Sequence, residues 1–158
     1  AHALDDGGLV DFIDAKLKER RLSGTGLALT LPASTLADRI DALVAFCQHA
    51  KPLALRVGLR DIGRDMTLVH RMRGVPVDYL RLSPELSGAA SDRAGEMLSA
   101  LVRRAHQSGM VVIASGVDSR EQATSLQAIG IDYAESPTLG PATADFNFEF
   151  SKWLGRVG

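Results

Sequence analysis

Cysteine is nearly absent from this sequence, in which Cys47 is the only thiol among 158 residues. One thiol cannot form an internal disulfide, so small folds that depend on such crosslinks are excluded. Cys47 lies on the apolar face of a predicted helix, and we predict that it is a small buried hydrophobe and not a nucleophile. This cysteine usage is compatible with a reducing, cytoplasmic location.

The chain also lacks a large excess of one charge and any long hydrophobic run. Its 18 Lys and Arg residues and 19 Asp and Glu residues give a formal net charge of -1. This balance provides no electrostatic attraction to nucleic acid or to an anionic membrane. The longest apolar runs are much shorter than the ~20 residues that span a bilayer, and segment 1–8 lacks the features of a signal peptide. We therefore predict a cytoplasmic segment with no nucleic-acid partner and no membrane insertion.

Several catalytic and nucleotide-binding motifs are missing as well. No GxGxxG sequence follows the first predicted strand, and no GxxxxGK[ST] phosphate-binding loop occurs. The histidines show no metal-ligand spacing such as HExxH, and neither Ser34 nor Ser115 stands in a GxSxG context. These absences argue against a dinucleotide-binding domain and against a serine nucleophile.

What the sequence does contain is a regular alternation of helical and strand patterns. Apolar spacing and capping residues predict helices over 9–22, from Ser34 or Thr35 to Cys47, and over 67–72, 92–108 and 119–129. Short apolar runs predict strands over 27–31, 52–59, 75–82, 110–114 and 131–134, and 83–90 is expected to be a loop. Such alternation produces a parallel sheet, either doubly wound or closed as a (β/α) barrel. Periodicity alone leaves these two architectures open.

The stretch 110–140 carries the clearest strand–helix–strand unit. Ser119 is predicted to cap its helix, with Gln122 at capping-box spacing, and Gly130 is predicted to end it. Parallel sheets carry their functional sites at the carboxyl ends of the strands. Two candidate site positions follow, 115–118 after one strand and 135–136 after the next.

The same stretch resembles the end of an EAL domain, the bacterial cyclic-di-GMP phosphodiesterase module. The family writes this region as AEGVE-x-x-x-Q-x-x-x-L-x-x-x-G-x-D-x-x-QG-Y-x-x-G, and ASGVDSREQATSLQAIGIDYAESPTLG follows that spacing without a gap. The identities are Gly116, Val117, Gln122, Leu126, Gly130, Asp132 and Gly140. Upstream, GVPVDYLRLSPEL resembles the family's LPVDYLKIDRSF, and LALRVGLRDIGRD stands in the place of its DDFGTG loop. The ending ADFNFEF resembles the FimX subgroup of degenerate EAL proteins.

This resemblance implies the fold and the organisation of the chain. The implied fold class is α/β, a parallel (β/α) repeat that forms a partial TIM-like barrel of the EAL type, with about five of the eight units. The family's opening strands, including the EAL signature itself, are expected upstream of Ala1. We predict an N-terminal linker or frayed start over 1–8, a truncated, degenerate EAL-like domain over 9–144 and an aromatic C-terminal tail over 145–158.

The resemblance also implies where a metal site would lie, and most of its ligands are replaced. Hydrolysis in the family is implied to use divalent cations held by carboxylates at the strand ends. The two glutamates of the family's FEITES segment fall on Thr30 and Ala33, which offer a hydroxyl and a methyl group. The first aspartate of DDFGTG falls on Arg60, which puts a cation where a cation should bind, and the second is kept as Asp61.

The remaining family positions follow the next three strands. The lysine and aspartate of KID fall on Arg81 and Ser83, the two glutamates of EGVE on Ser115 and Asp118, and the glutamine and glycine of QG on Glu135 and Ser136. Only Asp118 among these keeps the family's carboxylate, in a shortened form. Glu135 adds a carboxylate where the family has an amide.

These replacements change the charge balance of the implied site. Asp61, Asp118 and Glu135 stand beside Arg60 and Arg81, and these charges can neutralise one another without metal. We therefore predict no bound metal and no catalytic residue. We favour a structural ion-pair cluster of Asp61, Arg81 and Asp118 over a remnant ligand site.

Three functional hypotheses follow from the replaced residues. The first is a catalytically inactive EAL-like domain of a bacterial cyclic-di-GMP signalling protein, without a cofactor, that acts by protein–protein interaction or dimerisation. The alternative is a non-hydrolysing cyclic-di-GMP receptor, and the third is a hydrolase of altered specificity. The candidate ligand-binding positions are Arg60, Asp61, Arg81, Ser115, Asp118 and Glu135.

A partial barrel has surfaces that need a cover. Five parallel strands leave two sheet edges and an apolar inner face exposed. We predict that an upstream segment, a second copy in a homodimer or a signalling partner protein covers them. The isolated chain is therefore expected not to be a well-behaved monomer.

Overall fold

The structure is a computed structural model, which describes residues 8–63, 71, 74–88 and 93–136. The predicted N-terminal linker, apart from Gly8, and the predicted aromatic tail lie outside these residues. The predicted helix over 67–72 also lies outside them, except for Arg71. The domain limits proposed from the sequence therefore stay predictions.

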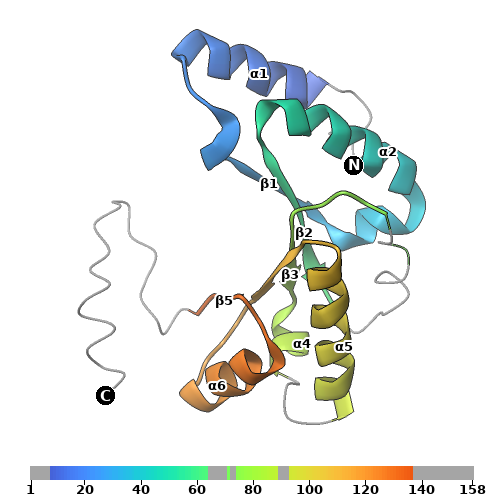
Figure 1. Cartoon of the computed structure of the whole chain (residues 1–158), viewed down its shortest axis with the longest axis vertical. Helices are drawn as coiled ribbons and strands as arrows, with labels where there is room; N and C mark the ends of the chain where they lie inside the picture. The colour runs from blue at the N-terminus through green and yellow to red at the C-terminus, as the bar shows by residue number, and fades with distance from the viewer. Residues whose placement is uncertain (1–7, 64–70, 72–73, 89–92, 137–158) are drawn as a thin grey trace, which may run out of the picture.

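Five parallel strands form one sheet in the described part of the chain (Figure 1). They lie in sequence order as β1 (Ala28–Pro32), β2 (Arg56–Ile62), β3 (Tyr79–Leu82), β4 (Val111–Ala114) and β5 (Tyr133–Ala134). Every neighbouring pair is parallel. The unbroken order confirms the predicted parallel (β/α) repeat of the barrel type, because a doubly wound sheet reverses its strand order at a switch point.

Helices separate most of the strands along the chain (Figure 1). α1 (Gly8–Arg20) precedes the sheet, α2 (Leu36–Ala50) joins β1 to β2, α4 (Pro84–Gly88) and α5 (Arg93–Gln107) join β3 to β4, and α6 (Arg120–Ile129) joins β4 to β5. The described residues also form the short 3-10 helices η2 (Gly24–Gly26), η3 (Ala33–Thr35) and η4 (Lys51–Leu53). Among the described residues, no helix has both the length and the apolar character needed to cross a bilayer.

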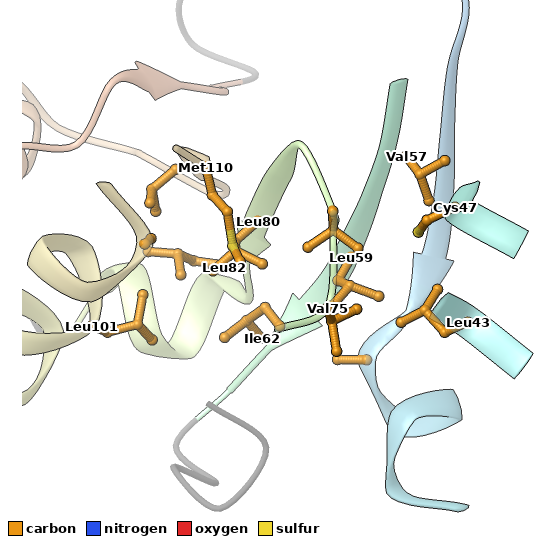
Figure 2. Packing of buried hydrophobic residues seen from close by; sticks show 14 of the residues in the cluster. Leu43, Cys47, Val57, Leu59, Ile62, Val75, Leu80, Leu82, Leu101 and Met110 are labelled. Carbon is orange, nitrogen blue, oxygen red and sulfur yellow. The ribbon is translucent and has the colours of Figure 1, made fainter. Parts of the chain in front are cut away.

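The hydrophobic core lies between one face of the sheet and helices α2 and α5 (Figure 2). The sheet contributes side chains at alternate positions, Val57, Leu59, Leu80, Leu82, Val112 and Ala114. Leu43 and Cys47 of α2 and Leu101 of α5 pack on the same cluster. Burial of each Leu or Val side chain stabilises the fold by about 1.5–3 kcal/mol. The sheet therefore turns the face that carries these side chains toward the helices. Because strand side chains alternate, the residues between them lie on the opposite face.

The second strand is shorter at its start than predicted. The sequence predicts a strand over 52–59, whereas β2 begins at Arg56. Pro52 lies in η4, and Ala54 at the end of η4 adopts a left-handed φ of 56°, which an extended strand does not allow.

The third strand is also shorter at its start. The sequence predicts a strand over 75–82, whereas β3 begins at Tyr79. The Val77 N–H donates to the Val75 carbonyl at 3.0 Å, which makes a tight local turn. Proline at position 76 has no N–H for a strand ladder and favours this local arrangement.

The loop predicted over 83–90 contains a helix, α4. Pro84 begins it, at a position where the missing N–H costs nothing. The Ser83 hydroxyl accepts the Leu86 N–H at 3.4 Å, and the Ser83 carbonyl accepts the Ser87 hydroxyl at 3.1 Å. The prediction of a loop was wrong here. In the sequence, Pro84 indicates an interruption of regular structure, whereas the hydrogen bonds of Ser83 make it the first residue of a helix.

Asp78 and Asp132 each form two hydrogen bonds to the amino end of a neighbouring strand. The Asp78 carboxylate accepts the Val57 N–H at 2.7 Å, and the Asp78 N–H donates to the Val57 carbonyl at 2.7 Å. The Asp132 carboxylate accepts the Val112 N–H at 2.7 Å, and its own N–H donates to the Val112 carbonyl at 3.1 Å. These pairs extend the parallel ladders at the end of the sheet opposite the candidate site.

Candidate functional site

The candidate site lies at the carboxyl ends of β2 to β5, on the sheet face opposite the core. The register pairs Arg81 with Ile113 and Ile113 with Tyr133, so these three residues share that face. Arg81 and Ile113 are half-buried and Tyr133 is exposed, whereas their strand neighbours Leu80 and Val112 are buried. Polar groups at this end of the sheet are therefore accessible to a ligand or a partner.

A bulge in β2 positions Arg60 and Asp61. Between Leu59 and Ile62, β2 gains one residue relative to β3. Asp61 adopts a φ of 62°, a conformation that residues other than glycine rarely take. Arg60 Nη1 donates to the Asp61 carboxylate at 2.5 Å, and the two side chains are 45% and 59% exposed. The bulge thus presents an ion pair at the end of β2.

Arg81, Ser115 and Glu135 meet across three strands. Arg81 Nε donates to Glu135 Oε2 at 2.7 Å, and Arg81 Nη2 contacts the same oxygen. The Ser115 hydroxyl, directly after β4, donates to this oxygen at 3.4 Å. Ser115 is buried, whereas the Arg81 and Glu135 side chains are 40% and 46% exposed. The structure therefore joins three of the predicted site residues in one cluster.

Asp118 joins neither pair. It is exposed, and its carboxylate forms no ion pair with another described residue. The predicted cluster of Asp61, Arg81 and Asp118 is therefore wrong in its membership, because Asp61 pairs with Arg60 and Arg81 pairs with Glu135. The expected neutralisation of carboxylates by arginines is confirmed for these two pairs.

Thr30, Ala33 and Ser83, which the resemblance aligns with metal ligands of the family, carry no carboxylate. Thr30 Oγ1 lies 2.5 Å from the Tyr79 hydroxyl, Ala33 is buried, and the Ser83 hydroxyl accepts a backbone N–H. Two guanidinium groups stand among these residues, and each is paired with a carboxylate. Within 8–63, 71, 74–88 and 93–136, no three His, Cys, Asp or Glu side chains gather in a metal-ligand arrangement. The residues present do not fit a pair of divalent cations, which need several carboxylate ligands.

Sequence reasoning missed the place of Tyr79. Its ring lies over Gly58 of β2, where a Cβ atom would stand 2.2 Å from the ring. Its hydroxyl contacts Thr30 Oγ1 at 2.5 Å and donates to the Leu29 carbonyl at 3.3 Å. Tyr79 therefore bridges β3 to β1 across β2, two residues before Arg81 and on the same face. The available signal was a glycine inside a strand, which often marks close packing by a neighbour.

Ser87 is the second residue that sequence reasoning missed. It is fully buried in α4, and its hydroxyl accepts the Ser115 N–H at 3.2 Å. The same hydroxyl donates to the Ser83 carbonyl at 3.1 Å. This bond holds the turn after β4 against α4, which places Ser115 next to Glu135. A serine in a predicted loop gives no sequence signal for such a role.

Cys47 lies in the core, away from this site, and its thiol is unreactive. Its side chain is buried against the sheet (Figure 2). Burial, with a smaller contribution from the negative charge of Asp78, raises the pKa of the Cys47 thiol to about 11. The thiol is therefore protonated at neutral pH, which confirms the prediction of a small buried hydrophobe.

The sequence matches the family profile described as EAL domain over residues 1–135. It is 24% identical over 124 residues to the cyclic di-GMP phosphodiesterase NbdA of Pseudomonas aeruginosa, which covers 77% of this chain and 16% of that protein. It is 24% identical over 102 residues to the cyclic di-GMP phosphodiesterase PdeL of Escherichia coli K12, which covers 63% of this chain and 28% of that protein. The chain thus spans less than a third of either relative.

Solved structures share the fold over most of the chain. The EAL domain of Xanthomonas citri FimX, in complex with c-diGMP, superposes with a TM-score of 0.85 at 22% identity, over 94% of this chain and 60% of that one. The FimX EAL domain from Pseudomonas aeruginosa, bound to c-di-GMP, gives a TM-score of 0.82 at 19% identity, over 94% and 63%. These similarities confirm the expected partial barrel of the EAL type.

Proposed function

This chain belongs to the EAL domain family, and on that basis we propose that it is a catalytically inactive EAL-like domain of a bacterial cyclic-di-GMP signalling protein. The observation that carries the proposal is the Arg60–Asp61 ion pair at the end of β2. By the resemblance, Arg60 takes the place of a metal-binding aspartate of the family, and its guanidinium neutralises Asp61, the second aspartate of that segment. Coulomb repulsion opposes a divalent cation beside a fixed positive charge.

The remaining donors support the same proposal. Metal-assisted hydrolysis needs several carboxylates around one position, where the metal activates a water molecule. Thr30 offers only a hydroxyl that already contacts Tyr79, and Glu135 is held by Arg81. A hydrolase of altered specificity would need the same missing ligands, so we favour the hypothesis of an inactive domain over it.

A hydrolysis assay tests this proposal and uses the longest natural chain that contains the sequence. With Mg²⁺ or Mn²⁺ supplied, we expect no cleavage of cyclic-di-GMP above the rate without protein, with an active family member as positive control. Metal-dependent cleavage by the unaltered chain overturns the proposal.

A binding measurement adds a readout that does not depend on turnover. Mn²⁺ is titrated while the paramagnetic broadening of the amide signal of Asp61 is followed. Arg60→Asp restores the family's carboxylate. We expect the amide signal of Asp61 to broaden at a lower Mn²⁺ concentration in this variant than in the unaltered chain. Equal broadening in both chains contradicts the argument from the arginine.

We propose that the domain acts by protein–protein interaction or dimerisation. The support comes from the sheet face opposite the core, where Tyr133 is 64% exposed and Val111 and Ile113 are half-buried. Within the described residues, β1 and β5 each bond a strand on one side only. Apolar side chains beside such edges suit contact with a second polypeptide in the cytoplasm.

A specific observation favours a second candidate function, that of a non-hydrolysing cyclic-di-GMP receptor. Arg60 and Arg81 present two partly exposed guanidinium groups at neighbouring strand ends. Guanidinium groups bind phosphate oxygens in a bidentate manner. The structures of FimX EAL domains with the same fold contain c-di-GMP. Saturable calorimetric binding of cyclic-di-GMP without cleavage supports this candidate, and the absence of binding overturns it.

A further inference from the structure

We propose that Glu135 competes with the phosphate group of an anionic ligand for Arg81 and thereby sets the affinity of the site. This inference rests on the second candidate function, the binding of a nucleotide phosphodiester. It comes from the geometry of Arg81, Ser115 and Glu135, in which the glutamate takes the hydrogen-bonding edge that a phosphate needs.

Arg81 commits one edge of its guanidinium group to Glu135. Nε and Nη2 both contact Glu135 Oε2, with the Nε bond at 2.7 Å. This edge of the planar fork suits the oxygens of a carboxylate and of a phosphodiester alike. A phosphate that binds there must displace the glutamate, or else two anions lie side by side and repel each other.

The glutamate side chain can leave without disturbing the sheet. Both partners are partly exposed, at 40% and 46%, and exposed ion pairs stabilise a fold little. The backbone at Glu135 is held independently, because its N–H donates to the Ala114 carbonyl at 2.8 Å and its carbonyl accepts the Val117 N–H at 3.1 Å. Displacement therefore moves one side chain while the strand end stays in place.

The Ser115 hydroxyl becomes free for a new acceptor when the glutamate leaves. This hydroxyl donates to Glu135 Oε2 at 3.4 Å, while the hydroxyl of Ser87 fixes the backbone N–H of Ser115 at 3.2 Å. A phosphate oxygen in the place of Oε2 would receive hydrogen bonds from both Arg81 and Ser115. The ligand class that this arrangement recognises is a phosphate ester, since a neutral nucleoside gains nothing from displacing the glutamate.

Calorimetric titration with cyclic-di-GMP tests the competition on the full chain and on Glu135→Gln, which keeps the side-chain size and removes the negative charge. We expect Glu135→Gln to bind about fivefold more tightly than the unaltered chain, the equivalent of about 1 kcal/mol and the upper range for an exposed ion pair. The matched control is Glu121→Gln, an exposed glutamate of α6 with the same change in net charge, whose affinity is expected to stay unchanged. Unchanged or weaker binding by Glu135→Gln overturns the proposal.

A second measurement separates this inference from the receptor function. Inorganic phosphate is titrated while the Nε–H signal of Arg81 is followed by NMR, and we expect a response at lower phosphate concentration in Glu135→Gln than in the unaltered chain. If this holds while cyclic-di-GMP binds none of the chains, the receptor function fails and the competition stands. If all chains bind the nucleotide equally, the competition fails and the receptor function stands. No difference in the phosphate response and no nucleotide binding overturns both.

Discussion

At the scale of single residues, Asp132 shows how one carboxylate fixes a strand end. It accepts the Val112 N–H at 2.7 Å and lies 2.9 Å from His106 Nε2. Burial alone would raise its pKa, but the hydrogen bonds from Val112 and His106 outweigh that effect and lower the pKa of Asp132 below its ordinary value. Its place at the amino end of the strands, away from the candidate site, indicates a role in stability.

The lowered pKa predicts that Asp132 stabilises the fold in a pH-dependent way. As the pH falls, the Asp132 carboxylate is protonated in the unfolded chain at a higher pH than in the folded chain. The stabilisation is therefore complete above the ordinary value of 3.8 and is lost as the pH falls through the lower folded-state pKa. We expect Asp132→Asn to reduce the free energy of unfolding by about 1 kcal/mol at neutral pH, and this difference to shrink below about pH 4. Urea unfolding across the acid range measures both.

Asp41→Asn is the matched control, since Asp41 is an exposed carboxylate of α2. It removes the same charge without removing a strand-end hydrogen bond, and we expect its stability to follow that of the unaltered chain at every pH. A stability difference for Asp132→Asn that stays constant down to strong acid contradicts the linkage argument.

Residue identities predicted which positions carry charge but not which charges meet. Arg60 and Asp61 are neighbours in sequence, so their pairing could be read locally. The partner of Arg81 lies 54 residues further along the chain, and the register of β3, β4 and β5 decides that it is Glu135 and not Asp118. A sequence pattern contains no direct measure of that register.

At the scale of elements, local chemistry predicted helix ends better than strand starts. The Ser119 hydroxyl accepts the Gln122 N–H at 3.1 Å, and Gly130, with a φ of 95°, ends α6 as predicted. These signals act within one helical turn, so the sequence carries them completely. The later starts of β2 and β3 follow from the left-handed φ of Ala54 and the turn at Val77, which an apolar run does not indicate. α4 is held in addition by a distant contact, the bond from Ser115 to Ser87.

The turn after β4 supplies a prediction about how α4 is held. Gly116 has a φ of 67°, and a Cβ atom there would stand 2.8 Å from the Cβ atom of Pro84. Gly116→Ala therefore combines backbone strain with a clash against α4. We expect it to lower the free energy of unfolding by about 2–3 kcal/mol, measured by urea denaturation.

Two other glycines separate the strain from the clash. Gly109 has a φ of 75°, and a Cβ atom there would have no neighbour within 4 Å, so Gly109→Ala is expected to cost only about 1 kcal/mol. Gly26 has neither a positive φ nor a neighbour within 4 Å, and Gly26→Ala is expected to change stability by less than about 0.5 kcal/mol. Equal losses for Gly116→Ala and Gly109→Ala contradict the close packing of α4 on the turn.

At the scale of the whole molecule, the alternation of patterns predicted a parallel sheet, and the family resemblance implied the barrel type. The rule that sites lie at the carboxyl ends of strands singled out the positions of Ser115 and Glu135, and the family resemblance added Arg81. Their joining into one cluster, and the bridge that Tyr79 makes across Gly58, could not be predicted. Both depend on side chains that cross a neighbouring strand, and only the three-dimensional sheet brings those strands together.

The exposed sheet face opposite the core leads us to predict that the chain of 158 residues self-associates in solution. Tyr133 is 64% exposed there and belongs to an outer strand of the described sheet, where a second chain can add. We expect the weight-average mass in sedimentation equilibrium to rise with concentration. Tyr133→Lys is expected to weaken self-association by about tenfold, or about 1.4 kcal/mol, because it replaces an apolar contact by a charge.

Phe12→Lys provides the matched control for this experiment. Phe12 is an aromatic residue of α1 that is 59% exposed, and α1 lies apart from β5, the strand of Tyr133 (Figure 1). The substitution removes an exposed aromatic ring and adds the same charge, so a general effect of solubility would appear in both variants. If the face of the sheet is the contact surface, Phe12→Lys leaves the association constant unchanged. A compact monomer at every concentration, or equal weakening by both variants, contradicts an interface on this face.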